Sequence, residues 1–577
     1  MLVKILFYVV ALFVNVVQLE NITRKWPKNA NVAGGDLFDF IVVGAGSAGA
    51  ALAGRLAEAA RWHVLLLEAG GDPPEESLVP GLSSQLLHSQ YDWSFSSEGD
   101  HYSSQAQRGG ALPLAQGKML GGTSSLNYMV YVRGNPEDYK QWPKGWDWPT
   151  VLPYFLKSEN MTDKNLLNDT DYAACHSDAG PMKVSTTDSN DSKVEELLEY
   201  MTDIGMKTLL DINGPEQLGA SKRYFTQSDR PSVRSSTAQS FLSPIADRKN
   251  LFVLKQAYVS KIIINEDNMA LGVQAIVNKA TLDFFTTKEV IICAGAINTP
   301  KILIASGIGP KNDVELLGVQ LKSDLPVGSE LLDHIVIPLV FTKDSDFDKN
   351  VSYPMVSDIN SIPTVHGFIS SDSGTQPDFQ VISSFLPKSS GLGYDLFYNK
   401  FNYAESVAKS VNNSNSEKDV VVFDIVLLHP ASTGYIRIKD ISKSSKPKIY
   451  TGYFTEEEDF DSFRTGINLV LNITNTRSFE SVNSSLVKLD LPQCTNFDYL
   501  SDDYWRCYIL NMGRTAYDLA GTCAMGKVVD SDLKVIGINK LRVVDASVVP
   551  SLPSGNINAP VIMIAERAAS MIKQCYI

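Results

Sequence analysis

The sequence has little positive charge. Its 577 residues include 51 lysines and arginines against 65 aspartates and glutamates, which gives a formal net charge of -14. Basic residues form no stripe along the chain, and a protein that binds nucleic-acid phosphates needs a basic face. The composition therefore argues against a nucleic-acid partner.

Cysteine and histidine are also scarce, with 6 and 7 residues. The chain has no C-x-x-C pair and no histidine cluster, so we expect no metal site. We predict one disulfide, between Cys494 and Cys507, because these residues bracket a short polar loop and an oxidising compartment would let them join. Cys293 lies in an apolar run, residues 290–294, and is expected to be a buried thiol.

Long apolar runs are absent apart from one near the start. Residues 5–17 are predominantly apolar and follow Lys4, but a membrane helix needs about 20 such residues. The run predicts a signal peptide over residues 1–20, with a retained anchor as the alternative because no A-x-A-type cleavage site is clear. We therefore expect a secreted, extracellular protein with no membrane span in its mature form.

Glycosylation signals support export. A glycosylated surface explains several N-x-S/T sequons in one chain better than a cytosolic location does. The sequons are at Asn21, Asn160, Asn168, Asn190, Asn350, Asn412, Asn472 and Asn483.

What the chain does contain is a glycine-rich turn at the end of an apolar run, within residues 38–49. The pattern G-x-G-x-x-G after such a run describes a buried strand that turns sharply into a helix. The first glycine makes the tight turn, the second lets a pyrophosphate approach the backbone, and the third lets the helix pack on the strand. We expect a dinucleotide to contact Gly44, Ala45, Gly46, Ser47, Ala48 and Gly49.

An acidic residue follows at the distance that such a site needs. A second apolar strand over residues 63–67 ends at Glu68, where a carboxylate can accept hydrogen bonds from ribose hydroxyls. The order of strand, turn, helix, strand and acid predicts dinucleotide binding. A structural glycine turn without a ligand is the alternative.

Three further glycine segments, residues 117–127, 295–310 and 555–560, are ambiguous alone. The first could be a tight loop, and the second is typical of an ordinary β–α connection. Together with Asp333-His334 and Gly521-Thr522-Cys523, however, they resemble the glucose-methanol-choline (GMC) family of FAD-dependent oxidoreductases from residue 36 onward. The chain looks like the secreted insect branch, and we expect a paralogue of the salicyl alcohol oxidase type.

The resemblance implies an α/β fold with two domains. A discontinuous Rossmann-type FAD-binding domain is expected from residues 36–335 and the C-terminal return 515–577. Residues 336–514 would form a substrate-binding cap domain with a β-sheet, and the runs 420–426 and 434–438 look like its strands.

The resemblance also implies a function. The protein would transfer a hydride from the CH–OH group of a small alcohol to FAD, and O2 or a quinone would then accept the electrons. No histidine occurs in residues 117–135, where family members with covalently attached flavin carry one, so covalent attachment is not needed. Further FAD contacts are expected at Gly122, Thr123, Asn127, Val259, Asp545 and Ala546.

The catalytic slot departs from the family pattern. The family's Tyr-His-Pro-x-Gly-Thr reads Tyr-Asp-Leu-Ala-Gly-Thr here, so Asp518 replaces the histidine, while Asn558 fills the second slot with an allowed residue type. No histidine follows His429, so none is expected to compensate locally, and we interpret His334 as a structural hydrogen-bonding residue. Gln116, where the family often has arginine, is a peripheral departure.

The substitution at Asp518 leaves two functions open. A neutral histidine takes the substrate proton and becomes a cation beside the reduced flavin, whereas an ionised aspartate puts a like charge there. The protein is then either an FAD-dependent alcohol oxidoreductase with altered, slow chemistry or an FAD-loaded binding protein with little turnover. A glycoprotein without flavin is disfavoured by the intact glycine motifs. From the sequence alone, Asp518→His is expected to raise the rate about 10²–10⁴-fold.

Overall fold

The computed structural model describes residues 25–186, 191–222, 224–226, 233–345, 362–372 and 374–576. The predicted signal peptide and the sequons at Asn21, Asn190 and Asn350 lie outside these residues. Within the part of the chain described, no helix has both the length and the apolar character needed to cross a membrane.

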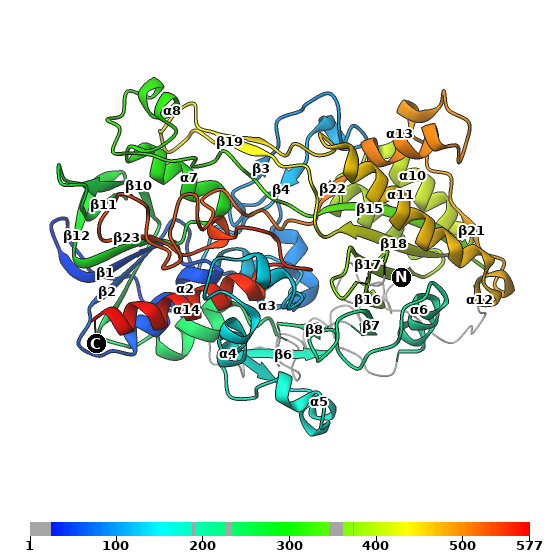
Figure 1. Ribbon diagram of the computed structural model, residues 1–577, viewed down its shortest axis with the longest axis horizontal. Helices are drawn as coiled ribbons and strands as arrows, with labels where there is room; N and C mark the ends of the chain where they lie inside the picture. Colours follow the sequence, from blue (N-terminus) through cyan, green and yellow to red (C-terminus); the bar gives the residue numbers. More distant parts are fainter. Residues whose placement is uncertain are drawn as a thin grey trace, which may run out of the picture.

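The first sheet carries the glycine turn (Figure 1). Its strand order is β10-β11-β12-β1-β2-β9, with β23 beside β12. Strands β12, β1, β2 and β9 run parallel, whereas β10, β11 and the first half of β12 form an antiparallel meander. The strands are β1 (Leu37–Val43), β2 (Val64–Glu68), β9 (Leu251–Lys255), β10 (Ala257–Ile264), β11 (Ala270–Val277), β12 (Ala280–Ile292) and β23 (Leu541–Val543).

Two helices from opposite ends of the chain pack side by side on this sheet. They are the alanine-rich α2 (Ser47–Ala57) and the C-terminal α14 (Asn558–Tyr576), drawn in blue and red in Figure 1. Arg55 of α2 forms an ion pair of 2.7 Å with the fully buried Glu566 of α14. Because β23 also joins the sheet, the C-terminal segment completes the Rossmann-type domain, as predicted.

The second sheet is wholly antiparallel, with the order β21-β15-β18-β17-β16-β7 and β22 beside β15. Strands β15 and β18 are buried along their whole length and are predominantly apolar. Helices α10 and α11 pack against β18, α13 packs against β15, and α6 packs against β7, β16 and β17. The strands are β7 (Gly219–Lys222), β15 (Ile335–Lys343), β16 (Thr364–Ile369), β17 (Phe379–Leu386), β18 (Asp419–Leu427), β21 (Ser485–Leu486) and β22 (Arg514–Thr515).

The remaining helices and strands cover the two sheets and connect them. The main ones are α4 (Trp148–Ser158), β5 (Glu159–Met161), α5 (Lys164–Asn168), β6 (Met182–Thr186), α6 (Ser192–Asp203), α7 (Gly295–Ala305), α8 (Lys311–Leu316), α10 (Glu405–Glu417), β19 (Tyr435–Arg437), β20 (Lys448–Tyr450), α11 (Glu457–Leu471), α12 (Arg477–Ser481) and α13 (Asp502–Met512).

One strand crosses the predicted division between the domains. Strand β7 lies within residues 36–335, which were assigned to the FAD-binding region, yet it pairs with β16 at the edge of the second sheet. The second sheet is therefore built from two separate parts of the chain. The predicted boundaries at residues 335 and 515 otherwise fall where β15 begins and where β22 ends.

The cysteines behave as expected. Cys494 and Cys507 form the predicted disulfide, with Cα atoms 5.7 Å apart, which ties the loop before α13 to that helix. Cys293 is a buried free thiol at the end of β12, and burial raises its pKa well above the ordinary value.

Candidate active site

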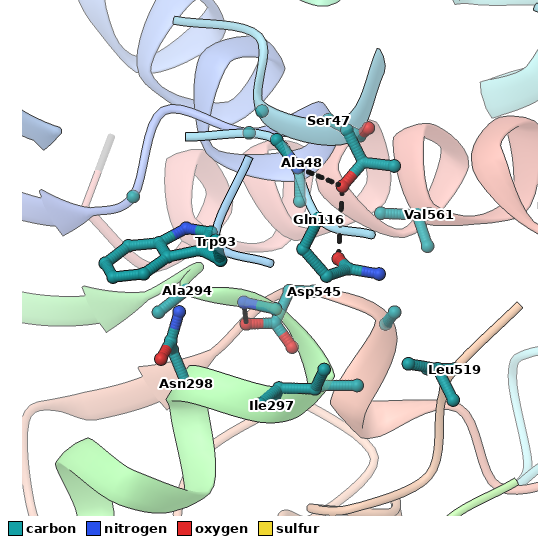
Figure 2. A pocket seen from close by; sticks show the side chains of 18 of the residues that line it. Ser47, Ala48, Trp93, Gln116, Ala294, Ile297, Asn298, Leu519, Asp545 and Val561 are labelled. Carbon is teal, nitrogen blue, oxygen red and sulfur yellow. Dashed lines mark hydrogen bonds between the residues drawn. The ribbon is translucent and has the colours of Figure 1, made fainter. Parts of the chain in front are cut away.

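A cavity of about 1760 Å³, counting its open mouth, lies at the carboxyl ends of β1 and β2. Figure 2 shows Trp93, Gln116, Asn298 and Asp545 around it, from four segments that are distant in the sequence. Ala45 and Gly49 do not contribute to its wall. The predicted site residues that do are Gly44, Gly46, Ser47, Ala48, Glu68, Gly122, Thr123, Asn127, Val259, Asp518, Asp545, Ala546 and Asn558.

The glycine turn has the geometry that its sequence predicts. Gly44 has φ +98°, and a Cβ there would lie 2.4 Å from the carbonyl oxygen of Cys293. A Cβ on Gly49 would lie 1.8 Å from the carbonyl oxygen of Gly44, so this glycine permits the close packing of helix on strand. Gly49 is thus structural, while Gly46 faces the cavity.

Glu68 serves both the turn and the cavity. Its carboxylate accepts hydrogen bonds from the backbone N–H groups of Ala45 (2.8 Å) and Gly70 (2.7 Å) and still lines the wall. Burial raises the pKa of Glu68 to about 7, although these hydrogen bonds and the charge of Lys118 act in the opposite direction. Each carboxylate oxygen accepts one of these hydrogen bonds, so the ionised Glu68 keeps lone pairs for ribose hydroxyls.

The second glycine segment, residues 117–127, packs directly against the first in the cavity wall. A Cβ on Gly122 would lie 2.7 Å from the Cα of Gly46, so no larger residue fits between the two turns. Thr123 donates a hydrogen bond to Gln116 (3.1 Å), and Asn127 accepts one from the buried Arg234 (2.9 Å). The segment is thus a wall of the cavity rather than an isolated tight loop.

The start of α7 forms a further wall that the sequence analysis did not assign to the site. Residues 294–298 line the cavity, although their pattern was interpreted as an ordinary β–α connection. Asp545 accepts hydrogen bonds from the Gly295 N–H (2.8 Å) and the Thr299 hydroxyl (2.6 Å), which fixes this helix start against the C-terminal segment. The next residue in the sequence, Ala546, also lines the cavity.

The arrangement suits a dinucleotide. Helices α2, α7 and α14 all begin at the cavity, and helix N-termini favour anionic phosphate groups. In addition, Oδ1 of Asn556 and Nδ2 of Asn558 are buried there without a hydrogen-bond partner among the described residues. Unsatisfied buried polar atoms are costly, so both atoms fit a site that a polar ligand completes.

Asp518 is buried at the cavity wall and has a histidine as its partner. Its Oδ2 lies 2.9 Å from Nδ1 of His334, and its Oδ1 accepts a hydrogen bond of 3.2 Å from the backbone N–H of Ile557. Although no histidine lies near this slot in the sequence, His334 lies beside it in the fold. Loop 515–522 and the start of β15 pair in the fold, through Ala516 and His334, and bring together residues that are 184 positions apart.

A second carboxyl group supports this loop. Asp333 accepts a hydrogen bond from the backbone N–H of Asp518 (3.0 Å), one from the Thr515 hydroxyl (2.6 Å) and one from Tyr453. Burial raises the pKa of Asp333 to about 7, and the nearby charge of Asp518 adds to this, while the hydrogen bonds and the charge of His334 lower it.

The two asparagines of the C-terminal segment occupy different positions. Oδ1 of Asn558 accepts a hydrogen bond of 2.8 Å from the Ser47 hydroxyl, which places this side chain against the glycine turn. Asn556, which the sequence analysis did not select, lies next to Ile557, the residue whose N–H contacts Asp518. No spacing in the sequence indicates which of the two amides faces Asp518.

Comparisons with known proteins agree with this geometry. Models of the GMC oxidoreductase family match residues 38–336 and 430–565. The chain is 38% identical to an ecdysone oxidase of Bombyx mori, over 96% of this chain and 84% of that protein, and 31% identical to a glucose dehydrogenase [FAD, quinone] of Drosophila melanogaster, over 93% and 87%. Among solved structures, an Aspergillus oryzae formate oxidase variant superposes with a TM-score of 0.78 at 27% identity, covering 94% of this chain and 99% of that one. A pyridoxine 4-oxidase from Mesorbium loti gives 0.77 at 25%, covering 93% and 99%.

Proposed function

Because the chain belongs to the GMC oxidoreductase family, whose members are FAD-dependent flavoproteins, we propose that it oxidises the CH–OH group of an alcohol. The observation that carries the proposal is a single cavity in which the glycine turn and Glu68 share a wall with Asp518. Bound FAD would supply the acceptor for the hydride that leaves the alcohol carbon.

The residues of the chain would hold the cofactor and accept the proton of the substrate. The two glycine segments and the starts of α2 and α7 would hold the diphosphate, and Glu68 would accept hydrogen bonds from the ribose. Asp518 would accept the hydroxyl proton of the substrate at a carboxylate oxygen. Asn558 keeps the role predicted for it in the second slot, although its contact with Ser47 also makes it a candidate for holding FAD.

An ecdysteroid is the first substrate to test. Two moth relatives named ecdysone oxidase, from Bombyx mori and Spodoptera littoralis, are 38% and 35% identical to this chain over 96% of its length. Other relatives are named for glucose and choline, so hydroxyl groups of several kinds are oxidised within the family. The expected salicyl alcohol oxidase type stays a prediction, and either O2 or a quinone is the electron acceptor.

The test is anaerobic mixing of the purified protein with ecdysone, glucose, choline and salicyl alcohol while the flavin absorbance is followed. We expect the protein to purify yellow and one of these alcohols to bleach it. A folded, glycosylated but colourless product that takes up no added FAD would contradict the cofactor assignment. Denaturation should release the flavin, because residues 117–135 contain no histidine for a covalent link.

One observation favours a second function. Both carboxylate oxygens of Asp518 already accept a hydrogen bond, so a substrate hydroxyl would have to share one of them with a protein donor. A protein that keeps FAD but is bleached by none of the alcohols would therefore act as an FAD-loaded binding protein. The same experiment separates the two functions.

We also propose secretion. The disulfide fits an oxidising compartment, and the sequon residues Asn168, Asn472 and Asn483 are exposed. Asn160 and Asn412 are half-buried, and Asn160 donates a hydrogen bond of 3.0 Å to the carbonyl of Gly180. Mass spectrometry after deglycosylation should therefore find a higher glycan occupancy at the three exposed sites than at Asn160. A protein that carries no glycan at any of the three exposed sites would contradict export.

A further inference from the structure

The contact between Asp518 and His334 changes the charge argument made from the sequence. We propose that His334 is positively charged in the resting protein, so that Asp518 and His334 together form a net-neutral base in place of the family's neutral histidine. This inference rests on the proposed function, because it concerns the proton of that reaction. Its test nevertheless needs no substrate.

The contact is direct and shielded from water. The two side chains lie 2.9 Å apart and are 8% (Asp518) and 0% (His334) exposed. A carboxylate can only accept a hydrogen bond, so Nδ1 of His334 carries a hydrogen and the charge depends on Nε2. Water and salt screen a buried pair weakly, which strengthens the attraction between a carboxylate and an imidazolium.

Two carboxyl groups lie near the imidazole. Asp333 and Asp518 both interact electrostatically with His334, and among the described residues neither carboxylate has a lysine or arginine in an ion pair. Asp518 is the one in direct contact with the ring, and burial raises the pKa of Asp333, so the proposed charge balance is that of the Asp518–His334 pair. The other titratable neighbour is His429, whose pKa is lowered by burial first and also by the charge of His334, while Asp138 raises it.

Nε2 of His334 decides whether the imidazole carries the charge. This atom is buried and has no hydrogen-bond partner among the described residues. A charged imidazole donates through both nitrogens, so Nε2–H would be left without an acceptor oxygen among these residues. We infer that the attraction between the imidazolium and the buried carboxylate of Asp518 exceeds this cost.

The proposed step balances atoms and charge. The O–H bond of the alcohol breaks and its proton forms an O–H bond on Asp518, while the hydride leaves carbon with its electron pair for FAD and the carbonyl bond forms. The net charge of the pair rises from zero to plus one, as it does for a neutral histidine, whereas a lone aspartate goes from minus one to zero. The pair therefore removes the like charge that makes a lone aspartate unsuitable.

A charge cycle on the FAD-loaded protein tests the inference. Sulfite adds to oxidised flavin as an anion, so its Kd reports the local charge without turnover. His334→Asn keeps an N–H donor for Asp518 but removes the imidazole, and it should raise the sulfite Kd by about tenfold or more. Asp518→Asn should lower the Kd by a similar factor, and the double variant, neutral again, should return within about threefold of the original protein.

The matched control is His366→Asn. His366 is a buried histidine whose Nδ1 lies 2.9 Å from Gln380 in the second sheet, and it does not line the cavity. The sulfite Kd of His366→Asn should stay within about twofold of that of the original protein. FAD content and thermal unfolding are measured for every variant, and His334→Gln replaces any His334→Asn protein that loses FAD.

Two results would overturn the inference: a His334→Asn protein whose Kd is unchanged, or single variants that shift the Kd in the same direction. The alcohol panel separates this failure from failure of the proposed function. If the sulfite Kd shifts in the expected directions but no alcohol bleaches the flavin, the charged pair is supported and the oxidoreductase function is rejected. Bleaching without these shifts leaves the function standing and rejects the charged pair.

Discussion

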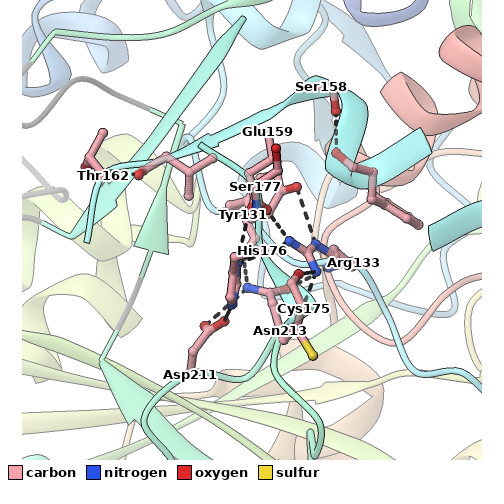
Figure 3. A network of polar contacts seen from close by, with 12 residues as sticks. Tyr131, Arg133, Ser158, Glu159, Thr162, Cys175, His176, Ser177, Asp211 and Asn213 are labelled. Carbon is pink, nitrogen blue, oxygen red and sulfur yellow. Dashed lines mark hydrogen bonds and ion pairs between the residues drawn. The ribbon is translucent and has the colours of Figure 1, made fainter. Parts of the chain in front are cut away.

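Two buried histidines in this molecule lie near two carboxyl groups each, and they differ in how the charge is balanced. His176 lies 2.9 Å from Glu159 and 3.2 Å from Asp211, and Arg133 forms an ion pair with Glu159 (Figure 3). Burial lowers the pKa of His176, but its contacts with the two carboxylates outweigh burial and raise it. This cluster contains two anions and two cations and lies outside the cavity wall.

The cluster at His334 lacks the arginine. Asp333 and Asp518 share one imidazole, one nitrogen of that imidazole is unpaired among the described residues, and Asp518 faces the cavity. A cluster whose charges are all paired holds segments together, as the first one joins β5 to the loops around His176 and Asp211. A cluster with an unpaired nitrogen and a carboxylate at a cavity can also exchange a proton. The comparison separates a structural cluster from a chemical one.

The largest difference between the clusters is expected in the rate of reaction. Asp518→Asn removes the proton acceptor and should lower the rate of flavin reduction by an alcohol about 10²–10⁴-fold, as measured by anaerobic stopped flow. Glu159→Gln, in the other cluster, should leave the rate of the folded protein within about threefold. Equal losses in the two variants would remove the distinction between the clusters.

Stability should respond in the opposite way. Burial raises the pKa of Glu159, but the charge of Arg133 and the hydrogen bonds from His176 and Arg133 outweigh it and lower the pKa from 4.5 to about 2. Its stabilisation is thus full above pH 4.5 and lost as the pH falls through 2, an effect of about 3 kcal/mol. Glu159→Gln leaves Arg133 buried without its partner and should cost about 3–5 kcal/mol at pH 7 in urea unfolding.

Surface substitutions change the free energy of unfolding by about 1 kcal/mol or less. If the free energy of unfolding of Glu159→Gln falls within that range of the original protein, the charges of this cluster are solvated in solution. The matched comparison is Glu58→Gln, because Glu58 forms a half-exposed ion pair with Arg55 and exposed pairs contribute about 0–1 kcal/mol.

The His334 cluster should show the opposite dependence on pH. The pKa of Asp333 is raised from 3.8 to about 7, so the folded protein binds this proton more tightly than the unfolded chain does. The contribution of Asp333 to the free energy of unfolding is full below pH 3.8 and is lost as the pH rises through 7, a change of about 4 kcal/mol. In Asp333→Asn the unfolding free energy should fall less between pH 4 and pH 8, and an unchanged slope would show that Asp333 titrates normally.

The smallest expected effect comes from restoring the family's residue. With His334 already balancing Asp518, Asp518→His should change the rate of flavin reduction by less than about tenfold, not by the 10²–10⁴-fold expected from the sequence alone. A gain in that higher range would mean that the slot itself limits turnover and would count against the charged pair. Stopped-flow rates at saturating alcohol distinguish the two results.

The FAD-binding half of the site was predictable because its signals are local. Gly44, Gly46, Gly49 and Glu68 lie within one strand-turn-helix-strand unit, where each residue type has one steric or polar task. The disulfide was predictable for the same reason, since its two cysteines lie close together in the sequence. Local spacing therefore carried most of the information about this half of the cavity.

The chemical half was not predictable, because its contacts are long-range. The contact between His334 and Asp518 depends on how loop 515–522 docks beside the start of β15, and nothing near either residue encodes that docking. The start of α7 looks like an ordinary β–α connection alone and becomes a cavity wall only where the fold brings it beside Asp545, whereas contacts in the second glycine segment were predicted from the family resemblance. Asn556 was missed because its distance from Asp518 depends on the same docking.

The edge strand β7 has a consequence for how this protein can diversify. Its four residues, Gly219–Lys222, hydrogen-bond to β16 from a part of the chain that precedes β9 of the first sheet. A genetic crossover that imports residues 336–514 from a relative therefore splits one hydrogen-bonded ladder between two parents. The shared backbone bonds survive such an exchange, but the side chains that pack across the ladder do not arrive together. An exchanged segment therefore needs matching side chains in β7 before the second sheet packs as it does in either parent.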